Sequence, residues 1–139
     1  MLEMDVIQVR GFRNIVQNGK ITGFQFRVRS TYYRGIWLSL LRPGDIIVDN
    51  ERFPRDSVLW EIGGLEYTPE EMLKTGDVQW PNSEAAVIKV KKPGGLESGY
   101  HDVSIGYRYI MSYIPPVVCS DEAFEHIPMD IFSKRMILV

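Results

Sequence analysis

Apolar and polar residues alternate with a period of two along much of this chain. The clearest runs are Ile21–Arg29, Ala86–Lys92 and Tyr100–Tyr113. In the third run the odd positions from Val103 to Tyr113 are apolar or aromatic, whereas Asp102 and other polar residues lie between them. Such alternation is typical of strands that bury one face. It predicts two packed sheets, because each sheet must cover its apolar face.

Residues that favour tight turns separate the strand-like runs. An Asn-Gly pair within Gln17–Lys20 predicts a hairpin that joins Phe12–Val16 to Ile21–Arg29. Further turns are expected at Arg42–Asp45 and Val48–Phe53. Because turns recur about every 8–12 residues, we predict an all-β fold, an antiparallel β-sandwich of the immunoglobulin or jelly-roll kind.

One short helix is expected within this β-rich pattern. Thr68 is a suitable N-cap, Pro69 fits the first helical position, and Glu71 stands three residues after the cap. We predict a helix over about Pro69–Lys74, which ends before Gly76.

The C-terminal segment departs from the alternation. Pro115-Pro116 breaks the last strand, and the residues that follow are too apolar for a disordered tail. We therefore divide the chain into a sandwich domain, residues 1–115, and an irregular extension, residues 116–139. The extension is expected to pack on the sandwich or, for at least part of its length, on a partner subunit.

Composition narrows the class of protein. The chain has 139 residues, enough for one domain with its own core, and 45% of them are hydrophobic. A net charge of −2 gives no electrostatic basis for binding nucleic acid. The lone Cys119 excludes an internal disulfide framework. We see no signal peptide and no apolar run long enough to cross a membrane, so a cytoplasmic location is expected.

Residues that carry chemistry are few. His101 and His126 lie outside any metal-ligand spacing, and we interpret His101 as a strand-end residue that makes a local hydrogen bond. Cys119 has no basic neighbour that would lower its pKa. We predict no catalytic residue, no metal site and no cofactor in this chain.

Aromatic residues are the more informative group. The segment "STYYRGIWLS", Ser30–Ser39, places tyrosine, arginine and tryptophan side chains around one glycine. Tyr and Trp suit the hydrophobic core, sugar faces and protein interfaces. Trp60 is interpreted as a core residue. For the segment itself a contact with a ligand or a partner is favoured over burial in the core.

Several stretches together resemble one family. They are "GFRNIVQNGKITGFQFRVR", "YYRGIWLS", "YTPEEM" and "KPGGLESGYHDVSIGYRYIMSY". Their order, from about Asp5 to Pro115, is similar to the beta subunit of the C-glycoside deglycosidases, or C-deglycosylation enzymes.

The resemblance implies a small β-sandwich subunit that assembles with a larger TIM-barrel alpha subunit. That partner would bind a divalent metal, expected to be manganese. It would also make most of the contacts to the aromatic 3-oxo-C-glucoside substrate. The bond cleaved joins carbon to carbon, so the two-carboxylate scheme of glycosidases does not apply. A base in the alpha subunit would remove the proton on C2, and elimination would release the aglycone.

The resemblance also gives the aromatic segment a role as a docking face, with Gly35 allowing a close backbone approach. The predicted interface residues are Tyr32, Tyr33, Arg34, Gly35, Trp37, Trp80, Phe124 and Phe132. Two other hypotheses stay open: a free-standing carbohydrate-binding module and a self-associating structural domain. A stand-alone enzyme has the least support.

Overall fold

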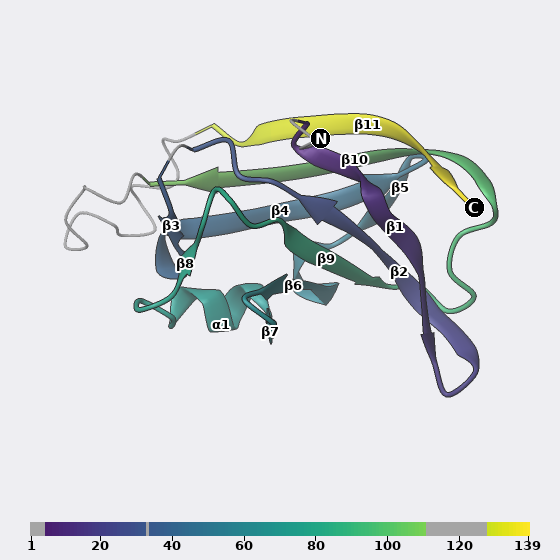
Figure 1. Cartoon of the computed structure of the whole chain (residues 1–139), viewed down its shortest axis with the longest axis horizontal. Coiled ribbons are helices and arrows are strands. Elements are labelled where there is room, and N and C mark those ends of the chain that lie inside the picture. Colours follow the sequence, from purple (N-terminus) through teal and green to yellow (C-terminus); the bar gives the residue numbers. More distant parts are fainter. Residues whose placement is uncertain (1–4, 33, 111–127) are drawn as a thin grey trace.

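Antiparallel β-sheets and one short α-helix make up the fold in the computed structural model, which describes residues 5–32, 34–110 and 128–139 (Figure 1). The larger sheet has five strands in the order β1-β2-β9-β6-β7. These strands are β1 Ile7–Gln17, β2 Lys20–Val28, β9 Ala86–Lys91, β6 Val58–Ile62 and β7 Leu65–Tyr67.

The second sheet has four strands in the order β11-β10-β4-β5. Its members are β11 Asp130–Leu138, β10 Gly99–Tyr109, β4 Leu41–Val48 and β5 Glu51–Phe53. A two-stranded sheet pairs β3 Ile36–Trp37 with β8 Gln79–Trp80. Short 3-10 turns span Leu38–Leu40 and Arg55–Ser57. This arrangement confirms the mostly β, antiparallel class, while the immunoglobulin or jelly-roll type stays a prediction.

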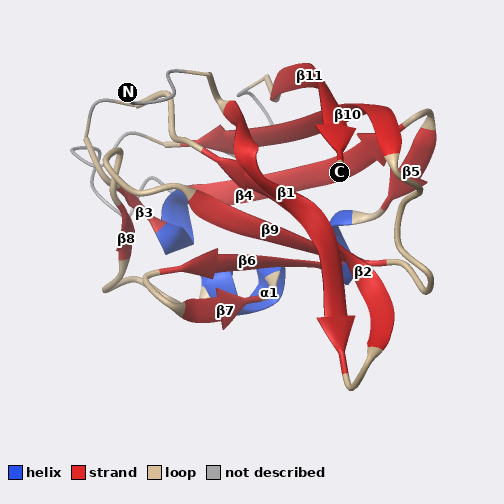
Figure 2. Cartoon of the chain, turned by 45° about the vertical axis from the view of Figure 1, so that its right-hand side comes forward, coloured by secondary structure: helices blue, strands red, loops and turns tan. Residues whose placement is uncertain are grey.

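The buried side chains of both larger sheets form one core. Figure 2 shows the strands of the two sheets. Phe24 and Phe26 of β2 are fully buried, as are Val103, Ile105 and Tyr107 of β10. The buried faces predicted for these strands are therefore confirmed. Trp60 is also fully buried, as expected, and its ring lies edge-on to those of Trp80 and Tyr107.

Tight turns follow the predictions at two of the three sites. Asn18 and Gly19 in the β1–β2 hairpin both have positive φ, as do Asp49 and Asn50 between β4 and β5. The turn expected at Arg42–Asp45 is wrong, because these residues lie inside β4.

A β-bulge explains how this Pro-Gly pair fits in a strand. Tyr107 lies opposite Pro43 and Ile105 lies opposite Ile46, so two residues of β4 face the single Gly106. Bulges accommodate proline, which cannot donate a ladder hydrogen bond.

The C-terminal strand β11 corrects the prediction of an irregular extension. It pairs with β10 in unbroken register, from Leu138 opposite Gly99 to Asp130 opposite Tyr107. The alternation was hidden because Ile131 and Ile137 occupy the solvent face, where they are 71% and 45% exposed. The proposed domain boundary after residue 115 lies outside the described residues.

The helix α1, Pro69–Leu73, matches its prediction to within one residue. The Thr68 hydroxyl accepts a hydrogen bond from the Glu71 N–H, and the Glu71 carboxylate accepts one from the Thr68 N–H. This is the predicted capping box. Within the described part of the chain, no helix has the length and hydrophobicity needed to span a bilayer.

Candidate functional site

The segment Ser30–Ser39 lies where the chain leaves β2 and enters β3. Tyr32 is only 6% exposed, and its ring centroid is 5.4 Å from that of Tyr109. Arg34 is exposed, whereas Gly35 and Trp37 are half-buried. Tyr33 lies outside the described residues. Among the described residues, the surface offered here includes the exposed Thr31 and Arg34 and parts of Gly35 and Trp37.

Pairing of β3 with β8 brings Trp80 beside this segment, since Ile36 lies opposite Trp80. Trp80 is nevertheless fully buried, and its indole N–H donates a 2.9 Å hydrogen bond to the Glu84 carbonyl. A Cβ added at Gly35 would lie 2.7 Å from Gln79 Oε1, so the close approach at this glycine is to the chain itself. The role of these residues as an interface stays a prediction.

The remaining predicted interface residues are separated from this group. Phe132 on β11 is half-buried, with its ring centroid 5.6 Å from that of Tyr107. Phe124 lies outside the described residues. Neither observation tests a contact with a partner.

Tyr107 connects the aromatic core to the start of the segment. Its hydroxyl accepts a 3.3 Å hydrogen bond from the Thr31 N–H and lies 3.4 Å from the Thr31 hydroxyl. Burial raises the pKa of Tyr107, so the phenol stays protonated at neutral pH. The exposed residues after Thr31 are thus positioned by a fully buried side chain.

His101 makes the local hydrogen bonds that its place at a strand end suggested. Its Nδ1 lies 2.5 Å from Asp49 Oδ2 and its Nε2 lies 2.6 Å from the Glu97 carbonyl. Burial alone would lower the pKa of His101, but the bonds to Glu97 and Asp49 outweigh burial and raise it. The pKa of Asp49 is lowered, first by the N–H of Asp102 and then by His101. Both ring nitrogens serve the fold.

Among the described residues, no group of three or more His, Cys, Asp and Glu side chains could hold a metal ion. His126 and Cys119 lie outside those ranges.

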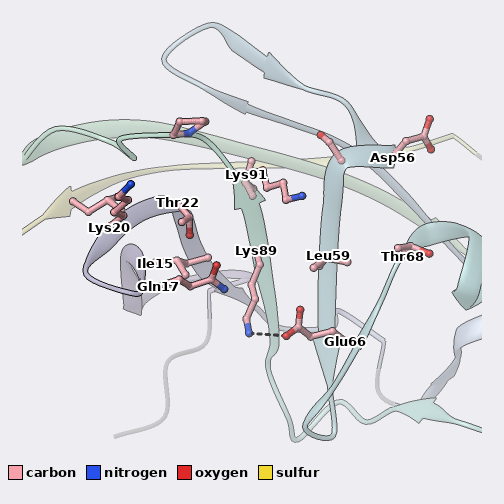
Figure 3. Close-up of a pocket in the computed structure, with 14 residues that line it drawn as sticks. Ile15, Gln17, Lys20, Thr22, Asp56, Leu59, Glu66, Thr68, Lys89 and Lys91 are labelled. Atoms are coloured by element: carbon pink, nitrogen blue, oxygen red, sulfur yellow. Dashed lines mark hydrogen bonds and ion pairs between the residues drawn. The ribbon is translucent and has the colours of Figure 1, made fainter.

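Sequence analysis missed an open groove of about 780 Å³ on the outer face of the five-stranded sheet (Figure 3). Ile15 of β1 and Leu59 of β6 line it, with Lys89 and Lys91 of β9 between them. The alternation predicted Lys89 and Lys91 to be exposed. It gave no indication that neighbouring strands would surround them with apolar side chains.

Lys89 is held by two carboxylates in the groove. Its Nζ lies 3.2 Å from Glu61 Oε1 and 3.4 Å from Glu66 Oε1. Burial would lower the pKa of Lys89, but these two partners raise it. Lys89 therefore stays charged and is neutralised locally.

Comparison with known proteins gives a consistent result. The family model described as C-glycoside deglycosidase beta subunit matches residues 2–113. A C-glycoside deglycosidase beta subunit from Eubacterium cellulosolvens is 48% identical over 118 residues, or 84% of this chain and 80% of that protein. A protein of the same name from Microbacterium trichothecenolyticum is 29% identical over 103 residues, or 72% of this chain and 73% of that protein.

Proposed function

The chain belongs to the C-glycoside deglycosidase beta subunit family, and we propose that it is the supporting, non-catalytic subunit of a hetero-oligomeric enzyme. The match of residues 2–113 to that family carries the proposal. The proposed location is the cytoplasm, with neither nucleic acid nor membrane as a partner.

The proposed partner is a TIM-barrel alpha subunit that binds a divalent metal, manganese, and holds most of an aromatic 3-oxo-C-glucoside. The ketone at C3 acidifies the proton on C2, and a base of the alpha subunit removes it. The metal would supply stabilisation of the negative charge that develops. Elimination then breaks the carbon–carbon bond, and a proton is transferred to the aromatic ring of the leaving aglycone.

A supporting role agrees with the contacts of His101 and Lys89, whose polar atoms bind partners within the chain. His101 is bonded through both ring nitrogens to Asp49 and Glu97, and Lys89 is occupied by Glu61 and Glu66. These groups stabilise the fold. We propose that Arg34, Gly35 and Trp37 contribute to the contact with the alpha subunit.

A free-standing carbohydrate-binding module has less support. Such a module needs exposed aromatic rings on which a sugar face can stack. Trp60 and Trp80 are fully buried and Tyr32 is 6% exposed, so these three rings cannot serve as a platform.

Co-expression tests the proposal. We expect a tagged copy of this chain to co-purify with the candidate alpha subunit and to yield activity on a 3-oxo-C-glucoside, while this chain alone is inactive. Sugar binding by the isolated chain, together with full activity of the alpha subunit without it, would contradict the proposal.

A further inference from the structure

The groove on the outer face of the five-stranded sheet is built by strand register. Ile15 lies opposite Gly23, and Gly23 lies opposite Lys91, so all three belong to one row across the sheet. Lys89 and Leu59 form part of the next row. Gly23 contributes no side chain between Ile15 and Lys91, and the backbone of β9 approaches closely there, since an added Cβ would lie 2.1 Å from the Val90 carbonyl oxygen. Figure 3 shows Ile15 and Leu59 on either side of the two lysines.

Positive charge on this face exceeds what the face itself neutralises. Lys89 is paired with Glu61 and Glu66. Within the described residues, the neighbouring cations make no ion pair and no hydrogen bond through their side chains. These cations are Lys20 and Lys91 in the groove and Arg13 and Arg27 beside it. The whole chain has a net charge of −2, so the surplus of cations is local.

One acid of the groove offsets this surplus only in part. Asp56 lines the rim formed by the 3-10 turn Arg55–Ser57, and the other lining carboxylate, Glu66, already pairs with Lys89. Among the described residues, Lys20 and Lys91 make no ion pair with Asp56 or with any other acid.

On the outer face of the four-stranded sheet, two arginines have acidic partners. Arg52 Nε lies 2.7 Å from Asp45 Oδ2. Arg135 lies 3.9 Å from Asp102 and over the Tyr100 ring. Arg52 and Arg135 are thus matched by acids, which sets them apart from Lys20 and Lys91 of the groove.

We propose that this groove binds an acidic segment of the partner subunit that also carries apolar side chains. The inference deepens the proposed function and rests on it. Lys20 and Lys91 would pair with carboxylates of the segment, while Ile15, Ile21 and Leu59 would cover its apolar side chains.

The shape of the groove favours a polypeptide over a small molecule. Small-molecule sites enclose most of the ligand and usually include aromatic side chains. None of the groove's lining residues is aromatic, and they come mainly from the β1–β2 hairpin, β9, β6, β7 and the 3-10 turn Arg55–Ser57. Such an open surface crossing several strands suits an extended chain.

Charge reversal in the assembled enzyme tests the inference. The double variant Lys20→Glu/Lys91→Glu is compared with the wild type for its affinity to the candidate alpha subunit, at low and at high salt. We expect the double variant to bind about 10- to 100-fold more weakly, because like charges would face each other. The wild-type affinity should fall with salt, and that dependence should be reduced in the variant.

The single variants Lys91→Glu and Arg135→Glu form a matched pair, because each reverses one charge and they lie on different sheets. Lys91→Glu should weaken binding, whereas Arg135→Glu should leave affinity unchanged. Hydrogen exchange of the wild-type complex should protect β9 and the β1–β2 hairpin. Should the double variant fail to fold, Lys91→Gln is used, and a reduced salt dependence is still expected.

The outcomes separate the two proposals. Failure of the wild-type chain to bind the alpha subunit overturns the proposed function and this inference with it. Wild-type assembly with an unchanged affinity of the double variant overturns the groove alone. Equal weakening by Arg135→Glu, protection confined to β10 and β11, or a homodimer that the double variant dissociates would also overturn it.

Discussion

The C-terminal strand offers the sharpest test of the fold. Met136 and Ile137 are neighbours on β11, and their side chains point to opposite faces. Met136 is 2% exposed and belongs to the core, whereas Ile137 is 45% exposed. Truncation to alanine at each position removes a side chain of similar size from one strand. Comparing the two variants therefore shows how much stability depends on burial at this strand.

The expected magnitudes follow from burial. Met136→Ala should lower the free energy of unfolding by about 2–4 kcal/mol, since it leaves a cavity in the core. Ile137→Ala should cost about 1 kcal/mol or less, mainly through its cross-strand pair with Tyr100. In thermal unfolding, the Met136 variant should melt roughly 10 °C lower than the wild type.

Urea unfolding of both purified variants measures this difference. Unchanged m-values would show that the change lies in stability and not in the extent of unfolding. Equal losses for the two variants, or a loss below about 1 kcal/mol for Met136→Ala, would refute the placement of β11 in the four-stranded sheet.

Three further outcomes are expected. The raised pKa of His101 means that its pairing with Asp49 stabilises the fold fully below about pH 6.5. That contribution is lost as pH rises through the folded-state pKa. The free energy of unfolding measured with urea should therefore depend less on pH in His101→Gln than in the wild type, between about pH 6 and pH 9. An equal dependence on pH in the two proteins would contradict this. Thr68→Ala removes the N-cap and should cost about 1 kcal/mol in the same assay, with Thr68→Ser close to wild type. Tyr107→Phe removes the bonds to Thr31 and should cost about 1 kcal/mol; a larger loss would indicate that packing had also changed.

Strand faces and short-range signals were predictable because they depend on neighbours in sequence. The period of two placed Phe24 and Val103 in the core, and the Asn-Gly pair placed the first hairpin. The capping box at Thr68 likewise needs only residues three positions apart. The family resemblance, which uses the order of several such stretches, is confirmed by the match to residues 2–113.

Features that depend on partners across the sheet were not predictable. The Pro43-Gly44 pair is typical of a turn, and only its register against Tyr107 makes it a bulge. The exposed Ile131 and Ile137 hid the alternation of β11. The groove depends on Ile15, Lys91 and Leu59, which come from three separate strands.

Burial also determines which variants can locate the docking face. Trp80 and Tyr32 belong to the same aromatic core as Tyr107, which holds Thr31 in place. A substitution at either residue would alter the core on which the segment packs. A loss of assembly would then not show that the substituted ring contacts a partner. Arg34 is exposed, and its truncation leaves that core intact. Weaker assembly after Arg34→Ala at unchanged stability would therefore indicate a direct contact with the partner. A Trp80 variant reports only on the aromatic core that supports the segment.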